Sequence, residues 1–323
     1  MTGRLRGAAL RVTLCAALLA IPWPRAGAQL LPESSLAVRY GDEWRIWWQS
    51  ARAPHRWSSA DSGLTGAVAW EPVQEGVDIA AIELAAAAPA WRLRVVLVRF
   101  DPQRLRLTVV DSVRAGGTRA GWTIDAAPMD AVLALNAGQF TGARPWGWIV
   151  RGGVEVQPPG AGPLSMALVL GSRGDARLIP VDSIEAVRAG GDVIEAFQSY
   201  PLLLRNGDVP EQLSGAGRGV DVAHRDTRLA LGELRDGRLL IAMTRFAALG
   251  ETGGGLPLGP TTPEMAALMG ALGCTDAMLL DGGLSAQLVV RDARGQVHAW
   301  KGWRRVPLAF VALPRTTSIP AAP

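Results

Sequence analysis

Short apolar segments bounded by turn residues recur along this chain, and they limit what it can fold into. The segments Leu229–Leu231 and Leu239–Thr244 flank Asp236-Gly237, a dipeptide typical of a tight hairpin turn. Trp148–Val150 and Val154–Val156, separated by a short segment with two glycines, show the same arrangement. Segments of this length, bounded by Gly and Asp, favour β-strands over helices. The chain is therefore predicted to be rich in hairpins.

Other apolar segments extend this pattern. Leu93–Phe100 and Leu105–Asp111 lie on either side of Asp101-Pro102-Gln103-Arg104, and the turn between them predicts a further hairpin. Four more segments are predicted to be strands: Ala131–Leu135, Leu164–Leu170, Leu202–Leu204 and Ala277–Leu280.

Helical signals are few. The clearest helix is predicted over Pro263–Leu272, with Thr262 as its N-cap and Pro263 at the first helical position. A shorter helix is predicted to begin at Asp182 or Ser183 and to end before Gly190. The order of elements has no regular βαβ rhythm. We predict an α+β fold with a mixed, largely antiparallel sheet, few helices and a single main domain.

Residues 1–28 have the pattern of a secretory signal peptide. A positively charged start is followed by the apolar segment Val12–Ile21 and by Ala26-Gly27-Ala28, a small-residue cleavage site. The apolar segment is shorter than the roughly 20 residues that a membrane span needs. We therefore predict an exported protein, periplasmic or secreted, without stable membrane insertion after signal removal.

The charge balance depends on this signal. The chain has 33 Lys and Arg residues against 29 Asp and Glu residues, a formal net charge of +4. All four cationic residues of the signal segment would leave with it, and that segment has no acidic residue. The mature chain is then nearly neutral, which argues against a nucleic-acid partner. Cys274 would remain as a lone cysteine, and no Cys or His spacing resembles a zinc site.

The most specific local motif is Leu279–Ser285, in which an apolar segment leads to Asp281. The following Gly282 and Gly283 permit a tight turn with exposed backbone N–H groups, and Ser285 adds a hydroxyl. This pattern is typical of a carboxylate delivered to an anion-binding turn. It also fits a plain turn in which the aspartate satisfies its own backbone.

Two further motifs offer groups for sugar and phosphate recognition. Asn136 follows a predicted strand, and its amide can both donate to and accept from sugar hydroxyls, with Trp146 and Trp148 available to stack on a sugar. Arg228 begins another strand, and its planar guanidinium can hold a phosphate. The residues alone also fit a turn-forming Asn136 with packed Trp residues, and an Arg228 salt bridge to Asp226 or Glu233.

Taken in order, these motifs resemble the phosphodiester glycosidase family from about Val68 to Leu313. The matching segments are Asn136–Phe140, Phe197–Pro201 with Asn206-Gly207, Arg228–Gly232, Glu264, Gly273, Asp276-Ala277 and Leu280–Ser285. Ala137, Gln139, Leu229 and Leu284 depart from the family pattern and indicate a divergent bacterial-type member. The chain is then divided into a signal peptide (1–28), a Trp-rich N-terminal extension (29–67), a phosphodiester glycosidase-like domain (68–314) and a C-terminal tail (315–323).

The resemblance implies a hydrolase that cleaves the glycosidic C–O bond of a sugar-1-phosphodiester, releasing sugar and phosphomonoester. It implies catalytic roles for Asp281, Arg228 and Asn136. Substrate-binding roles are implied for Gly282, Gly283, Ser285, Gln198 and Glu264. No cofactor is expected, although a divalent cation stays open, and the expected partner is a small-molecule or glycan sugar-phosphodiester. No sequence feature sets an oligomeric state.

Two alternatives remain. The same pocket suits a non-catalytic module of the cell envelope that binds glycans or sugar phosphates. It also suits a metal-dependent phosphodiesterase in which Asp281, Asp226 and Glu264 supply oxygen ligands. Such a phosphodiesterase breaks the P–O bond, whereas a glycosidase breaks the C–O bond to the anomeric carbon.

Overall fold

The fold was obtained as a computed structural model, and it describes residues 34–87, 90–112, 121–142, 144–215, 219–246 and 259–315. The predicted signal peptide and nearly all of the predicted C-terminal tail lie outside these residues. None of the helices in the described ranges is long and apolar enough to cross a membrane.

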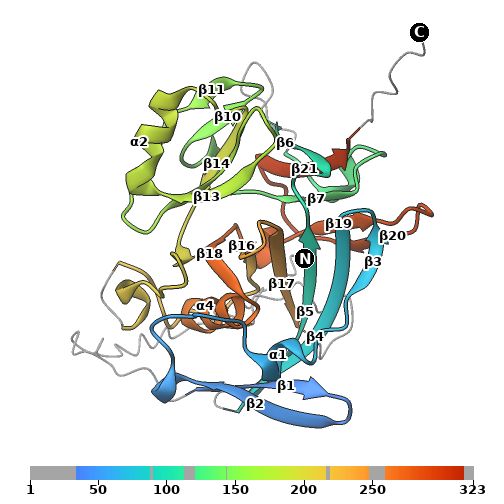
Figure 1. The fold of residues 1–323 in the computed structure, drawn as a ribbon, viewed down its shortest axis with the longest axis vertical. Coiled ribbons are helices and arrows are strands. Elements are labelled where there is room, and N and C mark those ends of the chain that lie inside the picture. The colour runs from blue at the N-terminus through green and yellow to red at the C-terminus, as the bar shows by residue number, and fades with distance from the viewer. Residues whose placement is uncertain are drawn as a thin grey trace, which may run out of the picture.

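A nine-stranded sheet forms the centre of the molecule (Figure 1). Most of its strands follow one another in the order β15 (Leu202–Leu204), β18 (Cys274–Leu279), β16 (Leu229–Leu234), β17 (Leu239–Phe246), β5 (Ala90–Phe100), β4 (Val77–Ala87), β1 (Ser35–Tyr40) and β2 (Glu43–Gln49), while β3 (Glu71–Gln74) pairs with β4. The first two strands of the N-terminal extension are therefore part of this sheet.

Two five-stranded sheets complete the β structure. One has the order β11 (Val154–Gln157), β10 (Ile149–Arg151), β14 (Glu195–Ser199), β12 (Met166–Leu170), β13 (Ala176–Pro180). The other has the order β20 (Val297–Trp300), β19 (Leu288–Arg291), β7 (Leu133–Asn136), β21 (Leu308–Pro314), β6 (Leu105–Asp111). A short ribbon joins β8 (Phe140–Thr141) to β9 (Arg144–Pro145). Every strand pair in the described residues is antiparallel, which confirms the predicted fold class.

One predicted hairpin is wrong. The segment Asp101–Arg104 does turn, with the Arg104 N–H donating to the Asp101 carbonyl at 3.1 Å. The strands on either side nevertheless enter different sheets, because β5 pairs with β4 and β17 whereas β6 pairs with β21. The chain thus passes from the central sheet to a neighbouring sheet at this turn. The other two predicted hairpins, β10–β11 and β16–β17, are confirmed.

Helices are few, as predicted. The α-helices are α1 (Ser62–Thr65), α2 (Val181–Gly190) and α4 (Thr262–Ala271), and the 3-10 turns are η1 (Ser50–Arg52), η2 (Ile124–Ala126), η3 (Glu211–Leu213) and η4 (Gly283–Ser285). The N-cap of α4 is Thr261, one residue before the predicted Thr262, because Thr261 Oγ1 accepts from the Glu264 N–H at 3.3 Å. The Glu264 carboxylate in turn accepts from the Thr261 N–H at 2.9 Å, which completes a capping box.

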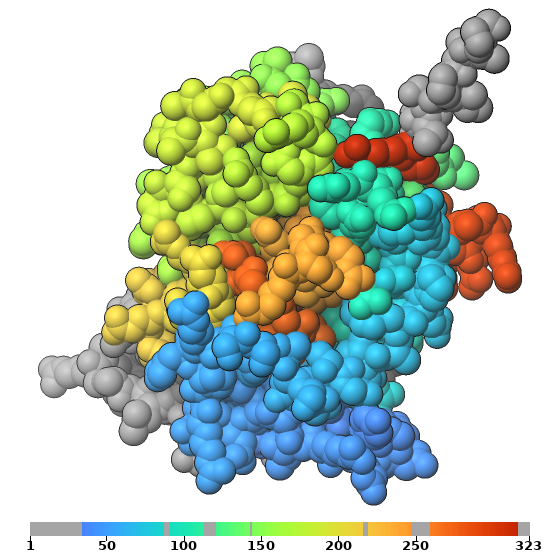
Figure 2. All heavy atoms as spheres, viewed as in Figure 1, coloured from blue at the N-terminus to red at the C-terminus, as the bar shows by residue number. Residues whose placement is uncertain are grey.

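Side-chain alternation in the central sheet fills two hydrophobic cores. Along β16, Leu229 and Leu231 face the core shared with the two smaller sheets, while Ala230 faces the core that contains α4. The second core also holds Trp57 and Leu64 of the N-terminal extension. Figure 2 shows the N-terminal extension, in blue, at one end of the molecule and the yellow-green α2 region at the other. The central sheet is therefore covered on both faces.

Candidate functional site

The strands β7 and β18 end beside each other and place Asn136 against Asp281. The Asn136 side chain is buried, and its Nδ2 donates to the Asp281 carbonyl oxygen at 2.7 Å. Its Oδ1 accepts from the Gln287 N–H at 2.9 Å. Both ends of the amide are thus committed to the segment 281–287. In this structure Asn136 holds the loop that carries the carboxylate.

Asp281 lies two residues after the end of β18 and is partly exposed. Its Oδ2 atom is buried and has no hydrogen-bond partner among the described residues. Burial raises the pKa of Asp281 to about 6, while a hydrogen bond from Ser285 and the charge of Arg304 act in the opposite direction. The neighbouring carboxylate of Asp226 adds a smaller contribution to this rise in the pKa. This carboxyl group therefore changes its protonation state near neutral pH.

The two glycines after Asp281 allow a second segment to approach closely. A Cβ at Gly282 would lie 2.5 Å from the Thr227 carbonyl oxygen, and one at Gly283 would lie 2.8 Å from Asp226 Oδ2. Gly283 has φ +55°, and its N–H donates to the Thr227 carbonyl at 2.7 Å. The Gly283 N–H is thus occupied by a hydrogen bond within the protein. The sequence had suggested that it faces a phosphate.

The segment that these glycines contact leads into β16 and carries Arg228. The Arg228 Nη2 donates to the His224 carbonyl at 2.6 Å, and its Nε donates to the Pro260 carbonyl at 3.1 Å. Within the described residues no carboxylate lies at ion-pair distance from this guanidinium. The salt bridge to Asp226 or Glu233 considered from the sequence does not form. Arg228 is thus a positioned, partly buried cation without an ion-pair partner in this part of the chain.

Arg225, three residues earlier, behaves differently. Its guanidinium forms a bidentate ion pair with Glu264, with Nη1–Oε2 at 2.7 Å and Nη2–Oε1 at 2.9 Å. The Glu264 side chain is 2% exposed and also accepts from the Ser34 hydroxyl at 2.7 Å and from the Thr261 N–H. Both carboxylate oxygens are therefore occupied. Glu264 anchors the start of α4. Burial lowers the pKa of Arg228, and Glu264 is one of three nearby carboxylates whose charges act in the opposite direction.

Gln198 is also committed to internal contacts. Its buried Oε1 accepts from the N–H groups of Trp148 and Gly160 at 2.9 and 2.8 Å. Its Nε2 donates to the Gly160 carbonyl and the Ser165 hydroxyl at 3.0 and 2.7 Å. Trp148 is buried as well, so it does not offer a face for a sugar. These residues organise the chain around β14 rather than presenting groups to solvent.

Exposed residues near Asp281 come from a segment that the sequence motifs missed. The N–H groups of Trp303 and Arg304 donate to the Leu284 carbonyl at 2.7 and 3.0 Å, which places them beside the Asp281 loop. Trp303 is 60% exposed and Leu284 is 43% exposed. The Arg304 guanidinium lies 4.8 Å from the centre of the Phe140 ring. A Cβ at Gly302 would meet the carbonyl oxygens of residues 284–286, so the two segments approach closely at this glycine. No sequence motif indicates this contact.

The predicted site residues therefore fall into two groups. Asn136, Asp281, Gly282, Gly283 and Ser285 come together, and Arg228 immediately precedes the neighbouring strand β16. Gln198 and Glu264 lie in the surrounding framework with their polar atoms already bonded. Among the described residues, no group of three or more His, Cys, Asp or Glu side chains is arranged to hold a metal ion.

Comparison with known proteins supports the relation suggested by the motifs. The phosphodiester glycosidase family profile matches residues 129–313. The fold is similar to the catalytic domain of zebrafish N-acetylglucosamine-1-phosphodiester alpha-N-acetylglucosaminidase, auto-inhibited by its pro-peptide, with a TM-score of 0.58 and 16% identity over 76% of this chain and 85% of that one.

Two other solved structures share the fold. One is a hypothetical protein from Synechocystis, with a TM-score of 0.52 and 16% identity over 87% of this chain and 68% of that one. The other is a protein from Burkholderia pseudomallei described as exported, with a TM-score of 0.51 and 17% identity over 72% of this chain and 77% of that one. No relative was found among curated protein sequences. The chain belongs to the phosphodiester glycosidase family.

Proposed function

We propose that this protein is an exported hydrolase that cleaves the glycosidic C–O bond of a sugar-1-phosphodiester. Water adds to the anomeric carbon, the bond from that carbon to the phosphate oxygen breaks, and the products are free sugar and a phosphomonoester. The observation that carries the proposal is the Asp281 carboxylate, which has a buried oxygen without a hydrogen-bond partner in the described residues and a pKa raised to about 6. Family membership supports the reaction class.

Asp281 is assigned the proton transfer. Above pH 6 it is ionised, and it can accept a proton from the attacking water or stabilise the positive charge that develops on the sugar ring. Ser285 and Arg304 favour the ionised form, so they keep this base available near neutral pH. Asn136 is assigned a positioning role, because both its polar atoms fix the loop that carries Asp281.

The departing phosphate is assigned to arginine side chains. Arg304 is exposed and close enough to Asp281 to influence its pKa, so a phosphate bound beside the carboxylate would meet its guanidinium. Arg228 is held by two carbonyl groups, which leaves its positive charge uncompensated by an ion pair within the described residues. Fixed cations of this kind stabilise negative charge as it develops on a leaving group. The exposed indole of Trp303 offers a face on which a sugar can stack.

The test is turnover of a panel of methyl hexose-1-phosphate diesters by purified protein, read as free sugar. Asp281→Asn keeps the shape of the side chain but removes the base, and we expect a loss of at least a hundredfold in turnover. The matched control is Asp130→Asn, an exposed aspartate in the loop before β7. Equal turnover by the wild type and Asp281→Asn would contradict the proposal, and sugar binding without product release would favour the non-catalytic alternative.

A further inference from the structure

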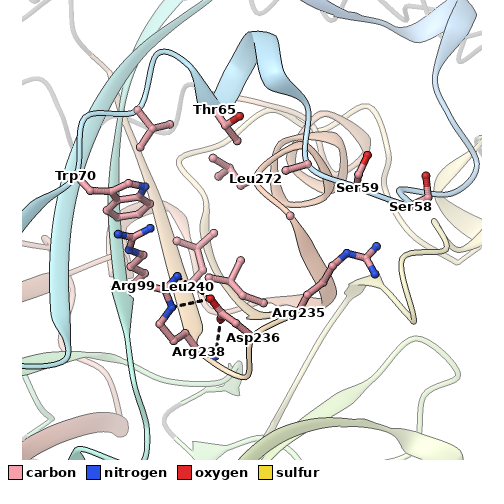
Figure 3. A pocket seen from close by; sticks show the side chains of 14 residues that line it. Ser58, Ser59, Thr65, Trp70, Arg99, Arg235, Asp236, Arg238, Leu240 and Leu272 are labelled. Carbon is pink, nitrogen blue, oxygen red and sulfur yellow. Dashed lines mark hydrogen bonds and ion pairs between the residues drawn. The ribbon is translucent and has the colours of Figure 1, made fainter.

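A pocket lies at the opposite end of the strands that carry the candidate site. Arg228 precedes β16 and Arg235 follows it, so the two residues are separated by roughly 20 Å of strand. Beyond Arg235 the chain lines a pocket of about 610 Å³, together with the end of α4 and part of the N-terminal extension (Figure 3). This volume is within the range of small-molecule sites.

The pocket holds more positive than negative charge. Arg99, Arg235 and Arg238 line it. Arg99 Nε pairs with Asp78 Oδ2 at 2.7 Å, and Arg238 Nη2 pairs with Asp236 Oδ2 at 2.6 Å. Asp78 is shared, since Arg238 Nη1 also lies 3.8 Å from its Oδ2. The three guanidinium groups thus face two carboxylates.

Arg235 is the third cation of the pocket, and it differs from the other two in its partners. It is exposed, and its Nη2 donates to the Trp57 carbonyl at 3.2 Å. No carboxylate lies at ion-pair distance from it among the described residues. Another acidic residue near this end of the sheet, Asp101, is paired with Arg104 at 3.3 Å. A ligand anion would therefore find one guanidinium with free charge and two that are held in place.

The remaining walls suit a polyhydroxylated ligand. In Figure 3, Trp70 and Arg99 stand on one side of the pocket and Ser58 and Ser59 on the other, with Leu272 between them. The Arg99 guanidinium lies 4.3 Å from the Trp70 ring centre, so stacking fixes the orientation of its donors. The serine hydroxyls donate and accept hydrogen bonds, and the apolar floor suits the C–H face of a sugar ring.

We propose that this pocket binds a small anionic saccharide, a sugar that carries a phosphate or a carboxylate. Arg235 would form the ion pair, Arg99 and Arg238 would add charge-assisted hydrogen bonds, and the hydroxyl groups of the ligand would meet Ser58, Ser59 and Asp236. Ser58 and Ser59 belong to the N-terminal extension, so this site assigns a binding role to a segment outside the family match. The inference does not depend on the reaction proposed above.

The test is isothermal titration of the purified full chain with glucose 6-phosphate and with glucuronate. Glucose 6-phosphate carries a phosphate and glucuronate carries a carboxylate, so the comparison shows which anion the pocket prefers. Glucose and inorganic phosphate serve as comparison ligands. We expect at least one of the two anionic sugars to bind more tightly than both glucose and phosphate. Arg235→Gln should raise the Kd about tenfold, since it removes a charged hydrogen-bond donor.

Three variants make the result specific. Arg188→Gln, which changes a cation on α2 paired with Glu155, should leave the Kd unchanged. Arg99→Gln should weaken binding like Arg235→Gln, while Asp281→Asn should not weaken it. Failure of both anionic sugars to bind, binding of phosphate alone, or an unchanged Kd in Arg235→Gln would overturn the proposal. Because turnover is measured separately, loss of one site is distinguishable from loss of the other.

Discussion

The Asn136 side chain and the Asp281 backbone are joined by a 2.7 Å hydrogen bond that links the end of β7 to the end of β18. These strands belong to different sheets. The bond therefore fixes the catalytic candidate at a junction between two layers of the fold. The same amide also accepts from Gln287, so one buried side chain determines where the loop begins and where it ends.

Replacing Asn136 with Ala should destabilise the protein by about 3 kcal/mol, because it leaves the partly buried Asp281 carbonyl and the buried Gln287 N–H without this partner. Asn136→Asp should also destabilise it, since a carboxylate would face the Asp281 carbonyl oxygen. Urea unfolding measures both effects. Free energies of unfolding within about 0.5 kcal/mol of the wild type would show that the loop does not depend on this side chain.

The pH profile should report Asp281. If the ionised carboxylate is the active form, turnover rises through pH 6 and levels off above it. Stability should change in the opposite direction. The folded protein retains a proton on Asp281 up to about pH 6, whereas an unfolded aspartate loses it near its ordinary pKa. Between these values the free energy of unfolding should fall as the pH rises, because the unfolded state releases a proton that the folded state keeps. Asp281→Asn should remove that slope.

Arg304 should determine the pH at which turnover rises, which is the acidic limb of the pH profile. Its positive charge lowers the pKa of Asp281, so Arg304→Gln should move the rise in turnover to higher pH. The control is the adjacent Arg305→Gln, whose Nη1 donates to the Gly121 carbonyl and which is not among the groups that influence Asp281. An acidic limb that stays in place in Arg304→Gln would contradict this assignment.

Two arginines in one short segment should respond differently to the same substitution. Arg225→Gln should destabilise the protein by about 3 kcal/mol, because it leaves the buried Glu264 carboxylate without its partner. Arg228→Gln should cost only about 1 kcal/mol of stability but lower kcat/KM at least tenfold. Urea unfolding and steady-state kinetics on the same preparations separate these effects. Similar kinetics for Arg228→Gln and the wild type would remove this residue from the site.

Gly283 should tolerate no side chain. Gly283→Ala would place a Cβ 2.8 Å from Asp226 Oδ2 at a positive φ of +55°. Gly295→Ala is the matched control, because Gly295 has φ +81° and nothing within 4 Å of its Cβ position. Both variants carry the backbone cost of about 1–2 kcal/mol. A further loss of stability in Gly283→Ala alone would measure the contact with Asp226, and equal losses would argue against it.

Local patterns predicted the strands well and their partners less well. The turn residues between Leu93–Phe100 and Leu105–Asp111 suggested a hairpin, yet the two strands join different sheets. A turn signal specifies that the chain bends, but strand pairing depends on contacts distant in sequence. The β16–β17 hairpin could be predicted because its turn is short and its partners are adjacent in the chain.

Some features of the candidate site could likewise be predicted from the sequence, and others could not. The family resemblance implied that Asp281 and Asn136 act at one site, and the structure joins them across two sheets. The sequence did not reveal that Gln198 and Glu264 are fully bonded inside the protein, since burial depends on packing by distant residues such as Ser165 and Ser34. Arg304 was missed because its segment has no motif of its own and reaches the site through the fold.

The most direct test of the account is hydrolysis of a methyl hexose-1-phosphate diester in ¹⁸O-labelled water, followed by mass spectrometry of both products. Cleavage of the glycosidic C–O bond with Asp281 assisting the water predicts the label in the free sugar and none in the phosphomonoester. The signal should fall at least a hundredfold in Asp281→Asn. Label in the phosphate would show P–O cleavage and contradict the account.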